Sequence, residues 1–158
     1  MNKADFMVAV TAIIENDTGE ILLIKRCSEA EYPNCWEDVG GRLKQSESPE
    51  EGLRREIKEE TGIEDIEIVK PLTVFHVYRN NTKNKENELI GIAYWCKTKT
   101  TEIVLSNEHT DYQWLSPKEA IDVTEHPALM SYLRIQMAEK QLSERVIFND
   151  NLGDVVNG

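Results

Sequence analysis

A short stretch of the chain is crowded with carboxylates, at Glu47, Glu51, Glu56, Glu59 and Glu60. On a helix, a rotation of about 100° per residue would place the last three within roughly a third of the circumference. Like charges at such spacings repel one another by about a few tenths of a kcal/mol per pair, so we expect a bound cation. Mg²⁺ suits these ligands, because it is a hard ion that takes carboxylate oxygens, water and phosphate. The alternative is a solvated acidic face.

The residues around these carboxylates favour the metal site. Gly40 and Gly41 allow a close approach of the backbone that other residues would resist. Arg55 can hold a neighbouring carboxylate through a fork of hydrogen bonds. Gly52, about one turn before Glu56, would lie on the same helix face and leave room there. The stretch therefore looks like a metal centre supported by its surroundings.

At nine defined positions the same stretch resembles the signature box of the Nudix family, namely Gly41, Glu47, Arg55, Glu56, Ile57, Glu59, Glu60, Gly62 and Ile63. The resemblance implies that Glu59 and Glu60 bind the metal with the backbone carbonyl of Gly40. It implies that Glu56 is a metal ligand or a base, and that Glu47 and Arg55 orient the others. The cofactor implied is Mg²⁺, with Mn²⁺ as a substitute.

A further carboxylate lies outside the box. Glu108 stands six residues before Trp114, where MutT-like members of the family supply another glutamate from a loop. By that resemblance Glu108 completes the metal site or acts as the base. The alternative is ordinary surface charge.

The chemistry that fits these parts is hydrolysis of a phosphoanhydride, which needs charge neutralisation on the phosphates and an oriented, partly deprotonated water. A nucleoside triphosphate, split into the monophosphate and pyrophosphate, is the substrate reached by elimination. The alternatives are an ADP-ribose or nucleotide-sugar pyrophosphatase, and a non-catalytic nucleotide-binding module of the same fold. A calcium-binding EF-hand is excluded, because its alternating loop ligands are missing.

Candidate substrate-binding residues are Trp36, Gly41, Phe75, Tyr78 and His109. Trp36 lies four residues before Gly40, a spacing that resembles MutT-like members, although Val39 stands where proline is common. Aromatic side chains can stack on a base, but in strands they more often belong to the core. His109 is a candidate because it adjoins Glu108, and otherwise it would be a packing residue.

The elements that must position these residues follow from the sequence pattern. Residues 6–14 and 21–24 predict two strands joined by a turn at 16–19. Residues 72–78 and 89–96 predict two more, joined by an exposed, mobile loop at 79–88. Ser48, Pro49 and Glu51 form a capping box that starts a helix, and Gly62 ends it.

Two more helices are expected near the end of the chain. Ser116 caps one that reaches about Val123. Beyond Pro127, apolar residues at fourfold spacing predict an amphipathic helix to about Leu142. The fold class is therefore α/β, and the family resemblance implies a Nudix-type α/β/α sandwich with a mixed β-sheet. We expect one domain at 1–148 and a flexible tail at 149–158.

Composition limits the partners. With 158 residues and a formal net charge of −11, the chain would repel long nucleic acid, whereas a metal ion can reverse the charge locally for a small nucleotide substrate. Three cysteines in no paired spacing indicate neither a disulfide framework nor a zinc site. There is no apolar run long enough for a membrane span or a signal peptide. We expect a cytoplasmic monomer or homodimer with no membrane partner.

Overall fold

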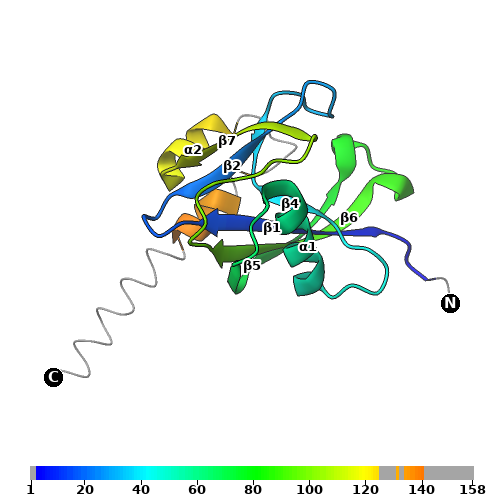
Figure 1. The fold of residues 1–158 in the computed structure, drawn as a ribbon. Coiled ribbons are helices and arrows are strands. Elements are labelled where there is room, and N and C mark those ends of the chain that lie inside the picture. Colours follow the sequence, from blue (N-terminus) through cyan, green and yellow to red (C-terminus); the bar gives the residue numbers. More distant parts are fainter. Residues whose placement is uncertain (1–2, 125–130, 132–133, 141–158) are drawn as a thin grey trace.

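A mixed β-sheet runs through the centre of the molecule in the computed structural model, which describes residues 3–124, 131 and 134–140 (Figure 1). The strands are β1 (Met7–Glu15), β2 (Ile21–Arg26), β3 (Trp36–Glu37), β4 (Val39–Arg42), β5 (Glu67–Tyr78), β6 (Glu88–Lys97) and β7 (His109–Leu115). The α-helices named in order are α1 (Pro49–Thr61) and α2 (Pro117–Val123). Residues 131 and 134–140 are also helical.

Parallel and antiparallel pairs are combined in this sheet. β1 pairs with β6 in parallel, and with β4 antiparallel along the other edge. β5 extends the sheet beyond β6, and β2 carries β3 and β7 on its two sides, all antiparallel. β1 and β2 pair at Glu15 and Ile21, beside the turn, and the two strands diverge beyond that pair. The space between them is where β4 and the residues before β7 meet.

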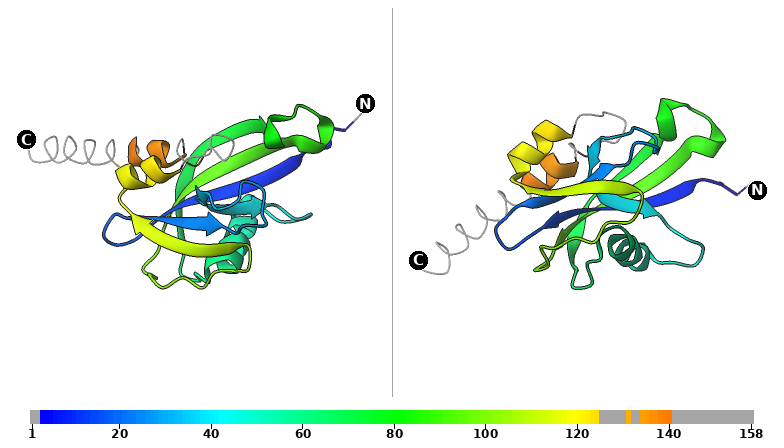
Figure 2. Two further views of the ribbon diagram at one scale, coloured as in Figure 1. Left: turned by 90° about the horizontal axis from the view of Figure 1, so that it is seen from above. Right: turned by 45° about the horizontal axis from the view of Figure 1, so that its top comes forward.

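Helices cover both faces of the sheet, which gives the three layers of an α/β/α sandwich (Figure 2). Alternate residues of β2 point to opposite faces, as the two-residue period of a strand requires. Leu22 and Ile24 join the core beneath α1, together with Leu53 and Ile57 of that helix. Ile21 and Leu23 join a second core with α2 and the helical residues 134–140. The predicted fold class is confirmed.

The helix α1 is defined at both ends by its own sequence. Ser48 accepts a hydrogen bond from the backbone of Glu51, and the Glu51 side chain accepts one in return from the Ser48 backbone. Pro49 occupies the first turn, where its missing N–H costs nothing. Gly62 ends the helix in the left-handed conformation, at φ 75°. This predicted helix is confirmed residue by residue.

Other predicted elements needed correction. β5 begins at Glu67, not at residue 72, because two irregularities in its pairing with β6 carry the strand past Pro71. The segment 79–88 is exposed as predicted, but it contains two 3₁₀ turns, η1 (Arg79–Asn81) and η2 (Lys85–Asn87). The strands β3, β4 and β7 were not predicted. The helix that begins at α2's predicted cap, Ser116, is confirmed.

Part of the C-terminal prediction lies outside the described residues. Residues 131 and 134–140 are helical, as the amphipathic pattern requires, but both predicted ends of that helix fall on residues that the structure does not describe. The predicted tail at 149–158 also lies outside them, so the domain limits stay a prediction. No helix among the described residues is long and apolar enough to cross a membrane.

Candidate active site

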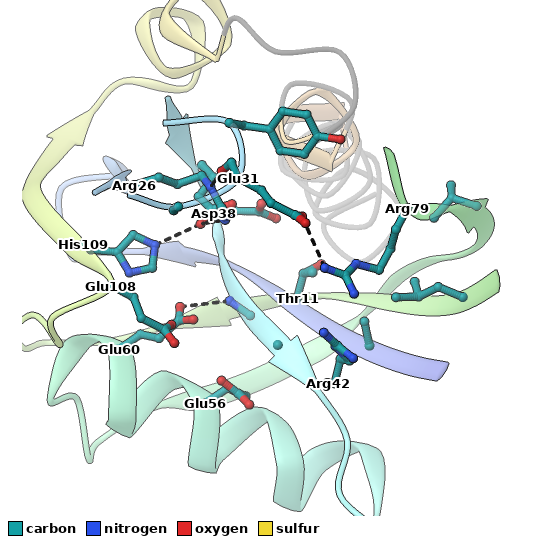
Figure 3. Close-up of a pocket in the computed structure, with 18 of the residues that line it drawn as sticks. Thr11, Arg26, Glu31, Asp38, Arg42, Glu56, Glu60, Arg79, Glu108 and His109 are labelled. Carbon is teal, nitrogen blue, oxygen red and sulfur yellow. Dashed lines mark hydrogen bonds and ion pairs between the residues drawn. The ribbon is translucent and has the colours of Figure 1, made fainter. Parts of the chain in front are cut away.

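A cavity of about 890 Å³ lies between α1, the sheet and the loops that follow β2 and precede β7 (Figure 3). Acidic side chains form one wall, with Glu56 and Glu60 from α1 and Glu108 from the loop before β7. Phe75 and Tyr78 of β5 line the cavity on the far side of β1 and β6. The cavity therefore has an acidic side and an aromatic side, which suits a phosphorylated nucleoside.

Arg55 neutralises most of the glutamates near the start of this wall. Its Nε and Nη2 atoms donate to the two carboxylate oxygens of Glu47, at 2.8 and 2.9 Å. Its Nη1 atom donates to Glu56 at 2.8 Å and to Glu59 at 3.2 Å. The hydrogen bond from Arg55 holds the pKa of Glu47 below its ordinary value. One guanidinium thus orders three carboxylates, as a planar fork can.

Glu60 is in a different situation. It is only 7% exposed, and the backbone N–H of Gly40 donates to its Oε2 at 3.3 Å. Burial raises the pKa of Glu60 to about 9, and the charge of Glu37 adds to this, while the Gly40 N–H opposes it. Within the described residues, no lysine or arginine forms an ion pair with Glu60. A cation supplied from outside would therefore stabilise its ionised form.

Glu56 lies between these two situations. Burial raises its pKa above the ordinary value, and the hydrogen bond from Arg55 works against that rise. Its carboxylate stands against Gly41, where an added Cβ would come within 2.3 Å of the Glu56 Cδ. Only glycine at position 41 lets β4 approach α1 so closely, which explains why Gly41 has no side chain.

The other two glycines act through packing. At Gly40 a Cβ would come within 2.4 Å of the carbonyl oxygen of Val10, so glycine is needed for the pairing of β4 with β1. At Gly52 a Cβ would come within 2.2 Å of the Leu43 side chain. The prediction that Gly52 leaves room at the acidic face was wrong, because the space is filled by Leu43.

The acidic wall fits a divalent cation. Glu60, Glu108 and His109 each offer one ligand atom, and these atoms all lie within 4.8 Å of one another. Carboxylate oxygens are the donors that hard dications prefer, and Glu60 has no protein cation in the described part of the chain. The donor set and the uncompensated burial of Glu60 both favour an ion at this place.

On the aromatic side, Phe75 lies across Gly91 of the neighbouring strand. An added Cβ at Gly91 would come within 2.0 Å of the Phe75 ring, so the ring needs that glycine. The guanidinium carbon of Arg134 lies 5.5 Å from the ring centroid, a cation–π distance. Arg134 is held by Asp38, with bonds of 2.6 and 2.7 Å, and Asp38 also accepts from Ser131 at 2.7 Å. This buried network fixes the ring in place.

Most of the predicted site residues are brought together, but not all. Glu56, Glu60, Glu108, His109, Gly40, Gly41, Phe75 and Tyr78 line the cavity. Glu47 and Arg55 lie behind the wall and hold it, and Glu59 faces outward with a side chain 53% exposed. Trp36 is not among the residues lining the cavity; it packs against the second core, with Lys25 5.9 Å above its ring.

Sequence reasoning missed several residues of the cavity wall, among them Arg26, Glu37, Asp38, Arg42 and Arg134. Arg26, Asp38 and Arg134 are committed to partners within the protein. Arg42 has no carboxylate partner within the described residues, and its Nη1 lies 3.1 Å from the sulfur of Met7. For Glu37, Asp38 and Arg42 the available signal was their position next to the box in the sequence, whereas Arg26 and Arg134 lie far from it.

Comparisons with known proteins agree with this geometry. A model of the NUDIX domain matches residues 5–134. The CTP pyrophosphohydrolase of Escherichia coli (strain K12) is 32% identical over 129 residues, covering 82% of this chain and 90% of that protein. Nucleoside triphosphatase NudI of Escherichia coli O139:H28 (strain E24377A / ETEC) is 29% identical over 133 residues, covering 80% and 94% respectively. Among solved structures, a MutT protein from Methanosarcina mazei Go1 is similar with a TM-score of 0.71 and 24% identity, covering 89% of this chain and 99% of that one.

Proposed function

Because this chain belongs to the Nudix family, we propose that it hydrolyses a nucleoside triphosphate to the monophosphate and pyrophosphate, with Mg²⁺ as the cofactor. The coarser statement, that it is a hydrolase of pyrophosphate bonds, follows from the family match and from relatives that are named pyrophosphohydrolases. The triphosphate is supported by two relatives, a CTP pyrophosphohydrolase and a nucleoside triphosphatase.

The observation that carries the proposal is the buried carboxylate of Glu60 facing the cavity. Its pKa of about 9 means that it holds a proton near neutral pH as long as no cation is near. A cation would displace that proton and bring the phosphates of a substrate to the same wall. In the proposed site, Glu56, Glu60, Glu108 and the Gly40 carbonyl would hold Mg²⁺, whereas Glu59, predicted as a ligand, is left out because its side chain is 53% exposed and bonded to Arg55.

When bound, Mg²⁺ supplies charge neutralisation for the phosphates and lowers the pKa of a coordinated water. The chain itself provides orientation. Arg55 holds Glu56 in place, and Gly41 allows that carboxylate to reach the cavity. Glu56 and Glu108 are the two candidates for the group that accepts the proton of the attacking water, because both carboxylates line the cavity.

The rest of the substrate is assigned to the remainder of the cavity. Arg42 has no carboxylate partner among the described residues, so we assign it to the phosphate chain. Phe75, held against Gly91 with the Arg134 guanidinium 5.5 Å from its ring centroid, lines the cavity, and we assign it to apolar contact with the base. Tyr78 and His109 complete the lining. Trp36 is no longer part of this assignment, since it packs in the second core.

The test is a substrate screen with product analysis. Purified protein is incubated with the eight common ribo- and deoxyribonucleoside triphosphates, ADP-ribose, a nucleotide sugar and a dinucleoside polyphosphate, each with Mg²⁺ or with a chelator. We expect monophosphate and pyrophosphate from a triphosphate, and no turnover in the chelator. Cleavage of ADP-ribose alone would replace the triphosphate by that alternative, and binding without turnover of any compound would favour the non-catalytic module.

The proton acceptor is identified in the same assay. Glu56→Gln and Glu108→Gln are compared across pH, with the kcat profile as the readout. The variant that has lost the acceptor should lose the ascending acid limb of that profile, whereas a variant that has lost only a ligand should keep the limb and require more metal. An unchanged limb in both variants would exclude both glutamates as the acceptor.

A further inference from the structure

His109 has an unusual environment for a histidine in a cavity wall. Its side chain is 3% exposed, and its Nε2 atom lies 2.9 Å from Oε1 of Glu37. Its other ring nitrogen, Nδ1, is buried and has no hydrogen-bond partner among the described residues. A buried polar atom without a partner has lost its hydration without compensation, so such atoms are rare unless a ligand or water satisfies them. The Nδ1 atom therefore calls for a partner from outside the protein.

The environment of Nε2 fixes what Nδ1 can do. Glu37 is a carboxylate and accepts hydrogen bonds, so it selects the ring form that carries its proton on Nε2. The neutral ring then has a free lone pair on Nδ1. Metal-binding histidines almost always donate their second ring N–H to a carboxylate, a backbone carbonyl or water. The pair formed by Glu37 and His109 has this arrangement.

The strands hold the arrangement rigidly. Glu37 of β3 pairs with Ile24 of β2, and His109 of β7 pairs with Arg26 on the opposite side of β2. Arg26 also donates to Glu37 at 3.0 Å. Three adjacent strands thus supply an arginine, a carboxylate and an imidazole in sequence, and the imidazole adjoins the acidic wall (Figure 3).

The remaining donors are close by. One ligand atom from each of Glu60, Glu108 and His109 lies within 4.8 Å of the other two. Three ligand atoms that share one ion at about 2.0–2.2 Å lie roughly 3–4 Å from one another, so these side chains must close by about 1–2 Å. Because Glu60 is buried and not paired with a protein cation in the described part of the chain, it can turn to an ion without breaking a salt bridge.

We propose that Nδ1 of His109 binds a metal ion together with Glu60 and Glu108, so that one position in this site has a nitrogen and two oxygen ligands. Such a set favours a first-row transition ion such as Mn²⁺ over Mg²⁺, because imidazole suits transition ions and Mg²⁺ prefers oxygen. The inference rests on the metal dependence in the proposed function, and it adds a ligand that the box residues do not include. Glu37 and Arg26 are positioning residues.

The experiment uses Mn²⁺ as the probe and pulsed electron paramagnetic resonance as the readout. The full chain, freed of metal, receives less than one equivalent of Mn²⁺, and coupling to a directly bound nitrogen is recorded. We expect ¹⁴N coupling, replaced by ¹⁵N coupling when only histidine is ¹⁵N-labelled. This comparison needs no variant. Bound Mn²⁺ without nitrogen coupling, or no binding of Mn²⁺ at all, would overturn the proposal.

Variants then locate the nitrogen. His109→Gln should abolish the coupling, and His76→Gln, at an exposed position on β5, should retain it. Glu37→Gln should retain the coupling but weaken Mn²⁺ binding by about 10- to 100-fold, as loss of an outer carboxylate does. Coupling that survives in His109→Gln would refute the assignment.

Hydrolysis is measured separately on the same samples. Nitrogen coupling without any hydrolysis of triphosphates would leave the ligand assignment standing and remove the proposed function. Hydrolysis without nitrogen coupling would do the reverse. The two proposals can therefore fail independently.

Discussion

The carboxylates of this protein fall into two groups that are treated in opposite ways. Glu47, Glu56 and Glu59 are all bonded to the single guanidinium of Arg55. Glu60 is the next residue after Glu59, yet it is buried, and among the described residues its hydrogen bond comes from the backbone N–H of Gly40. One group is neutralised by the protein, whereas Glu60 forms no ion pair with a lysine or arginine within the described residues.

This difference separates the carboxylates that hold the structure in place from the carboxylate that is open to a ligand. Where an arginine already holds the carboxylates, their positions are set before any ligand arrives, which is the preorganisation that catalysis needs. Where a carboxylate is buried without a cation, nothing offsets the free-energy cost of removing its charge from water. A bound metal ion would offset that cost. The two groups can be perturbed separately, each against a matched control variant.

The largest effect is expected for Glu60→Gln. It should lower the hydrolytic rate by at least about a hundredfold and leave the fold intact, because the amide fits the same space without the charge that binds the ion. Steady-state kinetics with saturating Mg²⁺ measure the rate, and circular dichroism checks the fold. The matched control is Glu59→Gln, one residue earlier, for which we expect a loss below about tenfold. Equal losses would mean that Glu59 turns into the cavity on binding.

A smaller loss is expected from Gly41→Ala. The new Cβ would collide with the Glu56 carboxylate at 2.3 Å, so that side chain must move away from its position beside β4. Displacements of this kind can cost up to about a hundredfold in rate, and we expect about tenfold here. Gly19→Ala is the control, in a turn at φ 81° where nothing lies within 4 Å: the strain of that backbone conformation should lower the melting temperature but leave the activity unchanged. Full activity in Gly41→Ala would contradict the close-approach argument.

Arg55→Gln tests the preformed group by stability. Hydrogen bonds to charged groups contribute about 1.5–3 kcal/mol to the free energy of unfolding. At about 2–4 °C per kcal/mol for a chain of this size, the melting temperature should fall by about 3–12 °C. Calorimetry in chelator measures it, with Lys58→Gln, in an exposed pair with Glu64, as a control that should change little. No fall would mean that the Arg55 group contributes nothing to folding.

The smallest effect is expected in how the free energy of unfolding depends on pH. Burial raises the pKa of Glu60 from 4.5 to about 9, so between these values the folded protein holds a proton that the unfolded chain has lost. The free energy of unfolding of the metal-free protein should therefore fall as pH rises through that window. Melting temperatures in chelator at several pH values should fall more steeply for the wild type than for Glu60→Gln. Parallel slopes would show that Glu60 is already ionised without a metal.

The box helix could be predicted from the sequence because the interactions that define it are local. Ser48, Pro49 and Gly62 act on neighbours a few residues away, and the hydrogen bonds they predict are present. The same holds for the crowding of Glu56 and Glu60, which needs only the helical repeat. The metal role of each glutamate stays a prediction. Glu56, Glu59 and Glu60 do lie on α1, but the Glu59 side chain is exposed and does not line the cavity.

What sequence could not provide depends on contacts between distant residues. The His109–Glu37 contact spans 72 positions, and the bonds from Arg134 to Asp38 span 96. β7 escaped notice because exposed polar residues interrupt it, so that it has no continuous apolar pattern. Trp36 was assigned to substrate by its spacing to Gly40, but the side chain points to the second core. The sequence spacing of a residue predicts its position along a strand, but it does not predict what packs against each face of that strand.

The bond between Asp38 and Arg134 has a consequence for how the molecule is made. Asp38 is synthesised 96 residues before its partner Arg134. Until Arg134 follows, the Asp38 carboxylate lacks that counter-charge and the Phe75 ring lacks that cation. The box helix can form from contacts within residues 48–62, whereas the wall of the cavity around Phe75 is complete only after Arg134 has been made.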